Sequence, residues 1–174
     1  APVVSAPVAP ASSSGGSVRQ TTVVGTVLSV PGALGSQIFY VDDGSGAIQV
    51  YKNDAQFPEL REGDTVRVSG TITESRGEQR LKIGKTNRIV VTGSADPIVA
   101  APMEIADISD ADHGRLLRVS GIVLARSGSR ATIESHGAQI DVRVADGTGI
   151  GAATFARGAS VEVTGILVVA NGTR

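Results

Sequence analysis

The chain of 174 residues has no cysteine and no tryptophan, and its only aromatic residues are three Phe and two Tyr. Without cysteine, disulfides, zinc–thiolate sites and thiol catalysis are excluded. No apolar run approaches the length of about 20 residues that a membrane-spanning helix needs. The net charge is only −1 at pH 7, so no overall field attracts nucleic acid or an anionic membrane. A core poor in aromatic residues has to be built from Val, Ile, Leu and Ala, which favours β-strands.

Signals for catalysis are also missing. The only histidines are His113 and His136, and neither lies in a nucleophile motif, a His-Glu metal pattern or a glycine-rich phosphate loop. The acidic turn at residues 42–46 lacks the spaced ligands and the distal Glu of a calcium loop. We therefore expect no enzyme activity, no metal and no other cofactor.

An internal repeat organises the chain. The segment GDTVRVSG at 63–70 returns as GASVEVTG at 158–165, an offset of 95 residues (158 − 63), and in both copies Val alternates with polar residues as in a half-buried strand. Two further segments return in the same order: VVGTV as VSGIV and GAIQV as GAQIDV. Three matches at a nearly constant offset predict two copies of one small β unit.

Alternation of apolar and polar residues predicts the strands of each copy. In the first copy they lie at 19–30, 37–41, 47–51, 65–74 and 79–91, the last interrupted near Gly84, with a loop or short helix at 55–60. In the second copy they lie at 115–126, 130–135, 138–144 and 160–170, with a short helix near 152–156. Only nine residues follow Gly165, so we expect the second copy to lack a fifth strand.

The segments VVGTV, FYVDDGSGAIQVY and LREGDTVRVSGTI cover most of residues 20–91 and resemble the OB domains of the tRNA-anticodon type. The resemblance implies a five-stranded Greek-key barrel, in a family whose members often bind nucleic acid. Applied to both copies, it predicts an all-β protein of two tandem OB-fold barrels with an extended N-terminal strand. The expected parts are a tail at 1–17, a first barrel at 18–95, a linker at 96–103 and an incomplete second barrel at 104–174.

The uncharged tail and the missing strand together suggest a structural role. An open barrel edge leaves backbone groups unpaired, and the tail carries Val3, Val4 and Val8 between prolines that permit an edge strand. Insertion of this tail into a neighbouring subunit is donor-strand complementation, and its head-to-tail geometry builds a filament. The acceptor edge would contain Val119, Ile122, Leu124, Val161, Val163 and Val168. Insertion into the same chain, or removal of the last strand by truncation, would explain the pattern as well.

On this hypothesis the protein is a self-assembling subunit of an extracellular filament, with itself as partner. The chain begins at Ala1, as it would after removal of a signal peptide, although loss of the initiator Met leaves the same kind of end. The sequon Asn171-Gly172-Thr173 favours a location on the cell surface.

Binding of single-stranded nucleic acid is the alternative. Such sites combine a basic groove with aromatic side chains on which bases stack. The fourth and fifth strands of the first unit carry Arg76, Arg80, Lys82, Lys85 and Arg88, and we expect Tyr40 and Tyr51 to face outward beside them. From residue 96 onward there are seven basic and nine acidic residues, with Phe155 as the only aromatic, so the second unit favours this function less. The acidic run Asp107, Asp110 and Asp112 offers ordinary ion-pair partners for the same basic residues.

Overall fold

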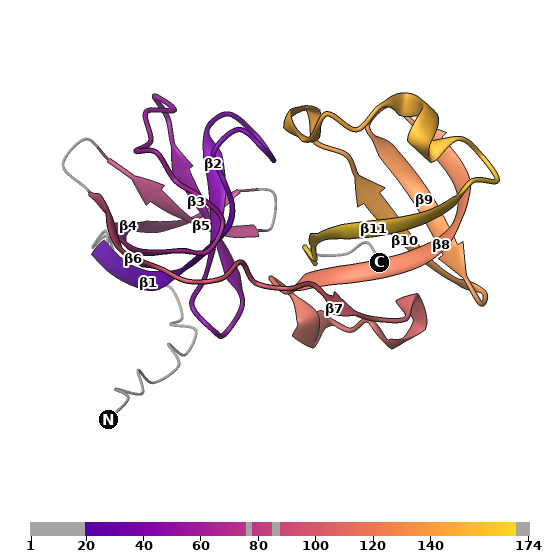
Figure 1. Ribbon diagram of the computed structural model, residues 1–174, viewed down its shortest axis with the longest axis horizontal. Coiled ribbons are helices and arrows are strands. Elements are labelled where there is room, and N and C mark those ends of the chain that lie inside the picture. Colours follow the sequence, from indigo (N-terminus) through magenta and orange to yellow (C-terminus); the bar gives the residue numbers. More distant parts are fainter. Residues whose placement is uncertain (1–19, 76–77, 85–87, 170–174) are drawn as a thin grey trace.

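The structure, a computed structural model, describes residues 20–75, 78–84 and 88–169 of the chain. Two β units lie side by side, the first drawn in indigo to magenta and the second in orange to yellow (Figure 1). The strands of the first unit are β1 Gln20–Ser29, β2 Ile38–Asp42, β3 Ala47–Lys52, β4 Asp64–Ser75, β5 Glu78–Ile83 and β6 Ile89–Ser94. Those of the second are β7 Ala101–Pro102, β8 Leu116–Ser127, β9 Arg130–Ser135, β10 Ala138–Arg143 and β11 Ser160–Ile166.

The first unit is a closed barrel. Its strands follow the order β1-β2-β3-β5-β4, and β4 pairs back onto β1. The β3–β5 pair is parallel and the other pairs are antiparallel. The expected fifth strand is divided into β5 and β6, which pair with the second and first halves of β4. The closed barrel that the resemblance implies is therefore present in the first unit, and the interruption of the last strand near Gly84 is confirmed.

The core of the barrel follows the predicted alternation. Phe39, Val41, Val50 and Leu81 are fully buried, and side chains of this kind each contribute roughly 1.5–3 kcal/mol on burial. The segment at 55–60 forms no helix. Instead, Phe57 packs edge-to-face on Phe39, with ring centroids 5.4 Å apart. The loop between β3 and β4 thus contributes an aromatic side chain to the core of the barrel.

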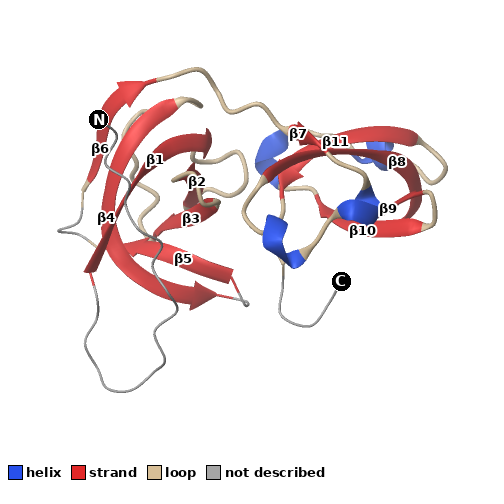
Figure 2. Cartoon of the chain, turned by 90° about the horizontal axis from the view of Figure 1, so that it is seen from below, coloured by secondary structure: helices blue, strands red, loops and turns tan. Residues whose placement is uncertain are grey.

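The second unit is an open sheet. Its order is β10-β9-β8-β11, with the short β7 parallel to β8. Among the described residues no strand joins β10 to β11, so two closed barrels are not observed. Its core contains Val123, Ala131, Ile133 and Phe155. Four 3₁₀ helices belong to this unit and appear blue in Figure 2, at Ile105–Asp107, Asp110–Asp112, Asp146–Thr148 and Ala152–Phe155.

The sequence repeat is also a repeat of backbone geometry. Val23 pairs with Val68 in the first unit, and the residues at the repeated positions, Val119 and Val163, pair in the second. The ladder of β1 and β2 shifts register between Val27 and Ser29, and that of β8 and β9 between Val123 and Ala125. The two copies therefore share a bulge as well as a pattern of side chains.

This geometry corrects the expected acceptor edge. β8 is not an edge strand, because Val119 pairs with β11 and the segment from Ile122 onward pairs with β9. Val161 and Val163 are half-buried against the second core. Among the described strands of the second unit, β10 and β11 are the edge strands, each with an unpaired outer edge. Leu124 is half-buried on β8, Val168 is exposed after the end of β11, and the expected donor residues Val3, Val4 and Val8 lie outside the described residues.

The two units meet through their backbones. The amide of Ala47, at the start of β3, donates a hydrogen bond of 2.8 Å to the carbonyl of Gly114. At a second point, a Cβ atom added to Gly147 would lie 1.7 Å from the carbonyl oxygen of Gly32. No side chain fits between the units at this second point.

Candidate functional site

The outer surface of β2, β3 and β5 gathers the polar side chains of the first unit. Because Phe39, Val50 and Leu81 point into the core, their neighbours in sequence point outward. The register places Tyr51 between Ile38 and Lys82, and it places Gln49 between Tyr40 and Arg80. Beyond β5 the same face continues onto β4, where Thr71 lies opposite Lys82 and Thr73 lies opposite Arg80.

An aromatic ring and a guanidinium group stack on this face. The Cζ atom of Arg80 lies 4.1 Å from the centroid of the Tyr51 ring, a cation–π contact. Arg80 is half-buried, and its Nε has no hydrogen-bond partner among the described residues. The stack presents two flat surfaces in a positively charged setting.

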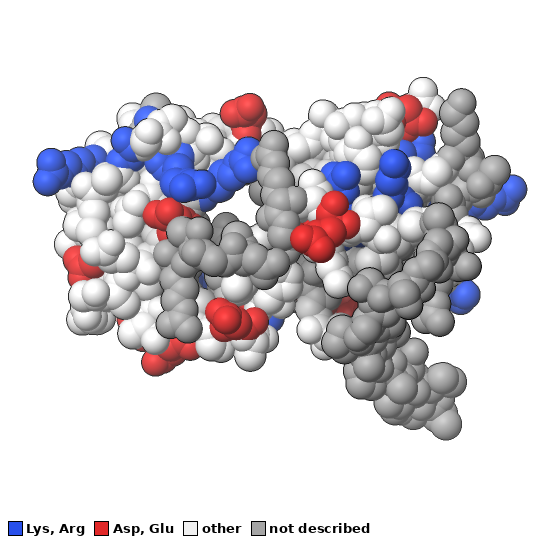
Figure 3. Space-filling view, turned by 180° about the vertical axis from the view of Figure 1, so that it is seen from behind, with Lys and Arg blue, Asp and Glu red and all other residues white. Residues whose placement is uncertain are grey.

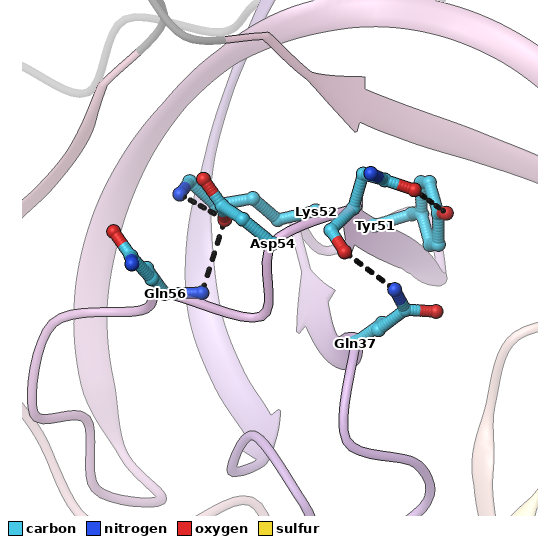
Figure 4. A network of polar contacts seen from close by, with 6 residues as sticks. Gln37, Tyr51, Lys52, Asp54 and Gln56 are labelled. Carbon is cyan, nitrogen blue, oxygen red and sulfur yellow. Dashed lines mark hydrogen bonds and ion pairs between the residues drawn. The ribbon is translucent and has the colours of Figure 1, made fainter.

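Hydrogen bonds from the loop after β3 hold Tyr51 in place (Figure 4). Its hydroxyl donates to Oδ1 of Asn53 at 3.0 Å, and the backbone carbonyl of Asn53 accepts a bond from Nε2 of Gln37. Lys52, the last residue of β3, forms an ion pair with Asp54 of this loop, and this contact holds the pKa of Asp54 below its usual range. The charge of Lys52 is therefore already compensated, whereas Lys82 is exposed with no ion-pair partner among the described residues.

Tyr40 does not offer the exposed ring that the sequence suggests. It points away from the core, yet only 6% of its surface is exposed. Its hydroxyl donates to Oε1 of Glu78 at 3.0 Å and accepts a bond from Nε2 of Gln49 at 2.9 Å. Tyr40 is thus part of a buried polar cluster, and Tyr51 remains as the accessible aromatic residue of this face.

Burial sets the ionisation of this cluster. It raises the pKa of the Tyr40 hydroxyl well above its usual range, and it raises the pKa of Glu78 as well. Charges from the second unit act in the opposite direction: Arg143 lowers the pKa of Tyr40, and His113 lowers that of Glu78. The cluster therefore lies where the two units meet.

The expected basic patch is partly assembled. Arg80 and Lys82 face outward from β5, and Arg88 is exposed before β6, with its carbonyl accepting a bond from the amide of Ser69 at 3.2 Å. Arg76 and Lys85 lie outside the described residues. Sequence reasoning missed Gln49, whose alternation with its apolar neighbours marks it as an outward residue, and it missed Gln37, which lies just before β2. It also missed Arg143, which no local pattern connects to this face, because only the docking of the units brings it there.

Other site types find no support in the described part of the chain. No group of three or more His, Asp or Glu residues there is arranged to hold a metal ion. None of the helices there is long and apolar enough to cross a membrane.

Comparison with known protein families identifies the fold of the first unit. Residues 21–92 match the model of the tRNA anticodon family, described as an OB-fold nucleic acid binding domain. No curated protein matches the chain. The matched segment contains the closed barrel and the face that carries Tyr51, Arg80 and Lys82, so the first unit is an OB-fold domain.

Proposed function

We propose that the protein binds single-stranded nucleic acid on the outer face of β2, β3 and β5. The observation that carries this proposal is the stack of Arg80 on Tyr51 beside the uncompensated charge of Lys82. In OB folds the face of the second and third strands is the one that contacts oligonucleotides. The match to a nucleic-acid-binding domain over the same residues supports the proposal.

The chemistry of the face suits an unpaired strand. A base can stack on the free side of the Tyr51 ring or on the guanidinium plane of Arg80, and a stacked base contributes about 1–3 kcal/mol. Lys82 and Arg88 are placed to attract phosphates. Bases in a duplex are already stacked on their neighbours, so a face that relies on stacking favours single strands.

The test is the anisotropy of a fluorescent oligo-dT of 15 nucleotides titrated with the full chain in about 50 mM salt. We compare Tyr51→Ala and Lys82→Glu with Arg67→Glu as the matched control. Arg67 is exposed on the outside of the same barrel, where it lies between Val24 of β1 and Val90 of β6.

We expect Tyr51→Ala and Lys82→Glu each to weaken binding at least tenfold, and Arg67→Glu to change it less than twofold. Circular dichroism confirms that each variant is folded. Equal losses in Lys82→Glu and Arg67→Glu would mean that the strand responds only to the total charge. Absence of binding by the unaltered chain would refute the proposal.

A second candidate is head-to-tail assembly into an extracellular filament. The observation in its favour is the unpaired outer edge of β11, over the half-buried Val161 and Val163. Electron microscopy of the chain with and without residues 1–17 tests it. Filaments that disappear with the tail would establish strand donation, and single particles in both samples would exclude it. The family match gives nucleic-acid binding the stronger support.

A further inference from the structure

We infer that the bound strand continues from the first unit onto the second, where Arg143 and Arg130 form its second phosphate-binding site. This inference rests on the proposed function and adds to it: the second unit, with more acidic than basic residues, becomes part of the binding surface.

The first observation is a like-charged pair across two strands. Arg143 of β10 lies directly opposite Arg130 of β9 in the register. Both point outward, because their neighbours Val142 and Ala131 contribute to the second core. Like charges in directly opposed positions destabilise a β-sheet. The pair therefore does not serve the stability of the fold, and an anion between the two guanidinium groups would relieve the repulsion.

The existing ion pair at this place is weak. Arg130 is 3.7 Å from Oδ2 of Asp141, and the two side chains are 67% and 50% exposed. Exposed pairs of this kind are worth at most about 1 kcal/mol, and salt screens them. A phosphate group can therefore compete with Asp141 for Arg130.

The second observation is the position of this pair beside the first unit. Arg143 is close enough to Tyr40 for its charge to lower the pKa of the buried hydroxyl. Tyr40 belongs to the row that continues through Gln49 to Arg80. The bond from Ala47 to Gly114 fixes the units at the same place. Arg143 thus lies near the Tyr40 end of this row, and the Tyr51–Arg80 stack lies at its other end.

Figure 3 shows the molecule from behind, with the second unit on the left. Blue Lys and Arg side chains lie on the upper part of each unit, and red Asp and Glu side chains lie among them. The 3₁₀ helix Ile105–Asp107 contacts β9 and β10 and buries Ile105 in the second core. The outward face of β9 and β10 also carries Asp141 and Glu134, so the excess of positive charge is confined to the end of the sheet where Arg143 lies opposite Arg130.

The inference predicts a dependence on strand length. A single OB domain occupies about 4–16 nucleotides, so a path over both units requires a longer strand than the first unit alone. We measure the anisotropy of labelled oligo-dT of about 6, 12 and 24 nucleotides. The variant is Arg130→Gln/Arg143→Gln, and the matched control Arg67→Gln/Arg118→Gln removes the same charge from exposed positions on both units.

We expect the unaltered chain to bind the longest oligonucleotide at least tenfold more tightly than the shortest. Arg130→Gln/Arg143→Gln should remove most of this gain and leave binding of the shortest unchanged. It should also reduce the slope of log K against log salt by about 1.4, since each phosphate contact with a single strand contributes about 0.7. The control variant should keep the gain with length.

A second pair of variants tests the same surface by removing negative charge, which should tighten binding of the strand instead of weakening it. Asp141→Asn removes the carboxylate that competes for Arg130 and should tighten binding of the long strand two- to fivefold. Glu162→Gln removes the same charge on β11, where Glu162 faces Ser120, and should have less effect.

The outcomes separate this inference from the proposed function. If Arg130→Gln/Arg143→Gln binds every length as the unaltered chain does, the inference is wrong and the face of the first unit remains the whole site. Equal losses in the variant and its control would also overturn it. If the unaltered chain binds no length, the proposed function itself fails.

Discussion

Removal of one hydroxyl group, in Tyr40→Phe, probes the buried cluster between the two units. The ring stays in place and no large cavity is created, so the measured effect reports on the hydrogen bonds. The substitution deprives Glu78 of its donor at 3.0 Å, and it leaves Gln49 only the longer contact of 3.3 Å to Glu78. A hydrogen bond to a charged partner is worth about 1.5–3 kcal/mol, and one between neutral groups about 0.5–1.5 kcal/mol. We expect a loss of about 2 kcal/mol at pH 7 and about 1 kcal/mol in acid.

The pH dependence follows from the ionisation of Glu78. Burial raises its pKa in the folded state, so protonated Glu78 is compatible with the fold, and the stability of the unaltered chain falls as the pH rises through that raised pKa. The bond from Tyr40 opposes this effect because it favours the charged carboxylate. Without that bond, the decline between acid and neutral pH should become steeper.

Urea unfolding followed by far-ultraviolet circular dichroism, at several values between pH 4 and pH 7, measures the effect. Glu78→Gln is the control, since it should remove most of the pH dependence in this range. The Tyr40→Phe/Glu78→Gln double variant completes the cycle and isolates the coupling between the two side chains. An equal loss at pH 4 and pH 7, or a coupling near zero, would refute the reasoning.

Three further substitutions test the fold. Gly121→Ala should cost several kcal/mol or prevent folding, because its Cβ would lie 2.5 Å from the carbonyl oxygen of Glu134, whereas Gly165→Ala, with open space around it, should be neutral in the same urea experiment; equal effects would contradict the close approach of β8 to β9 at Gly121. Leu81→Ala should lower the free energy of unfolding by about 2–5 kcal/mol, and a loss below 1 kcal/mol would argue against a closed barrel. Asp112→Ala should destabilise the chain at neutral pH and much less in strong acid, because bonds from Ser109 and Arg115 lower the pKa of Asp112 and their contribution is lost as the pH falls through that lowered pKa; a constant difference in urea midpoint would count against this.

Most of the first unit could be predicted from its sequence because period and turns agree along the whole segment. The alternation around Phe39, Val50 and Val68 identifies inward positions, and Gly84 marks the division of the last strand. For residues 55–60 the sequence left a loop and a short helix open; the segment is a loop, and the packing of Phe57 on the core could not be predicted. The reason is that contacts formed by tertiary packing leave no period in the sequence.

The site was less predictable. Arg80, Lys82 and Tyr51 could be found because they alternate with core residues on neighbouring strands. Tyr40 alternates in the same way but is buried, since Glu78 and Gln49 bind its hydroxyl and the second unit lies beside it. Nothing in the sequence around Arg143 indicates that this residue lies close to Tyr40 of the first unit. The residues that one unit buries on the other, or places beside it, depend on how the two units dock. The alternation of residues within a single strand carries no information about this docking.

The contact between Gly147 and the carbonyl of Gly32 has a consequence for how such a protein can evolve. After a duplication, two copies joined by a flexible linker are free to accumulate substitutions independently. Here any side chain at position 147 would separate the units, and the Ala47–Gly114 bond ties backbone to backbone at a second point. We therefore expect the loops at the junction to change together or hardly at all. The outward positions of β11, by contrast, are free to diverge.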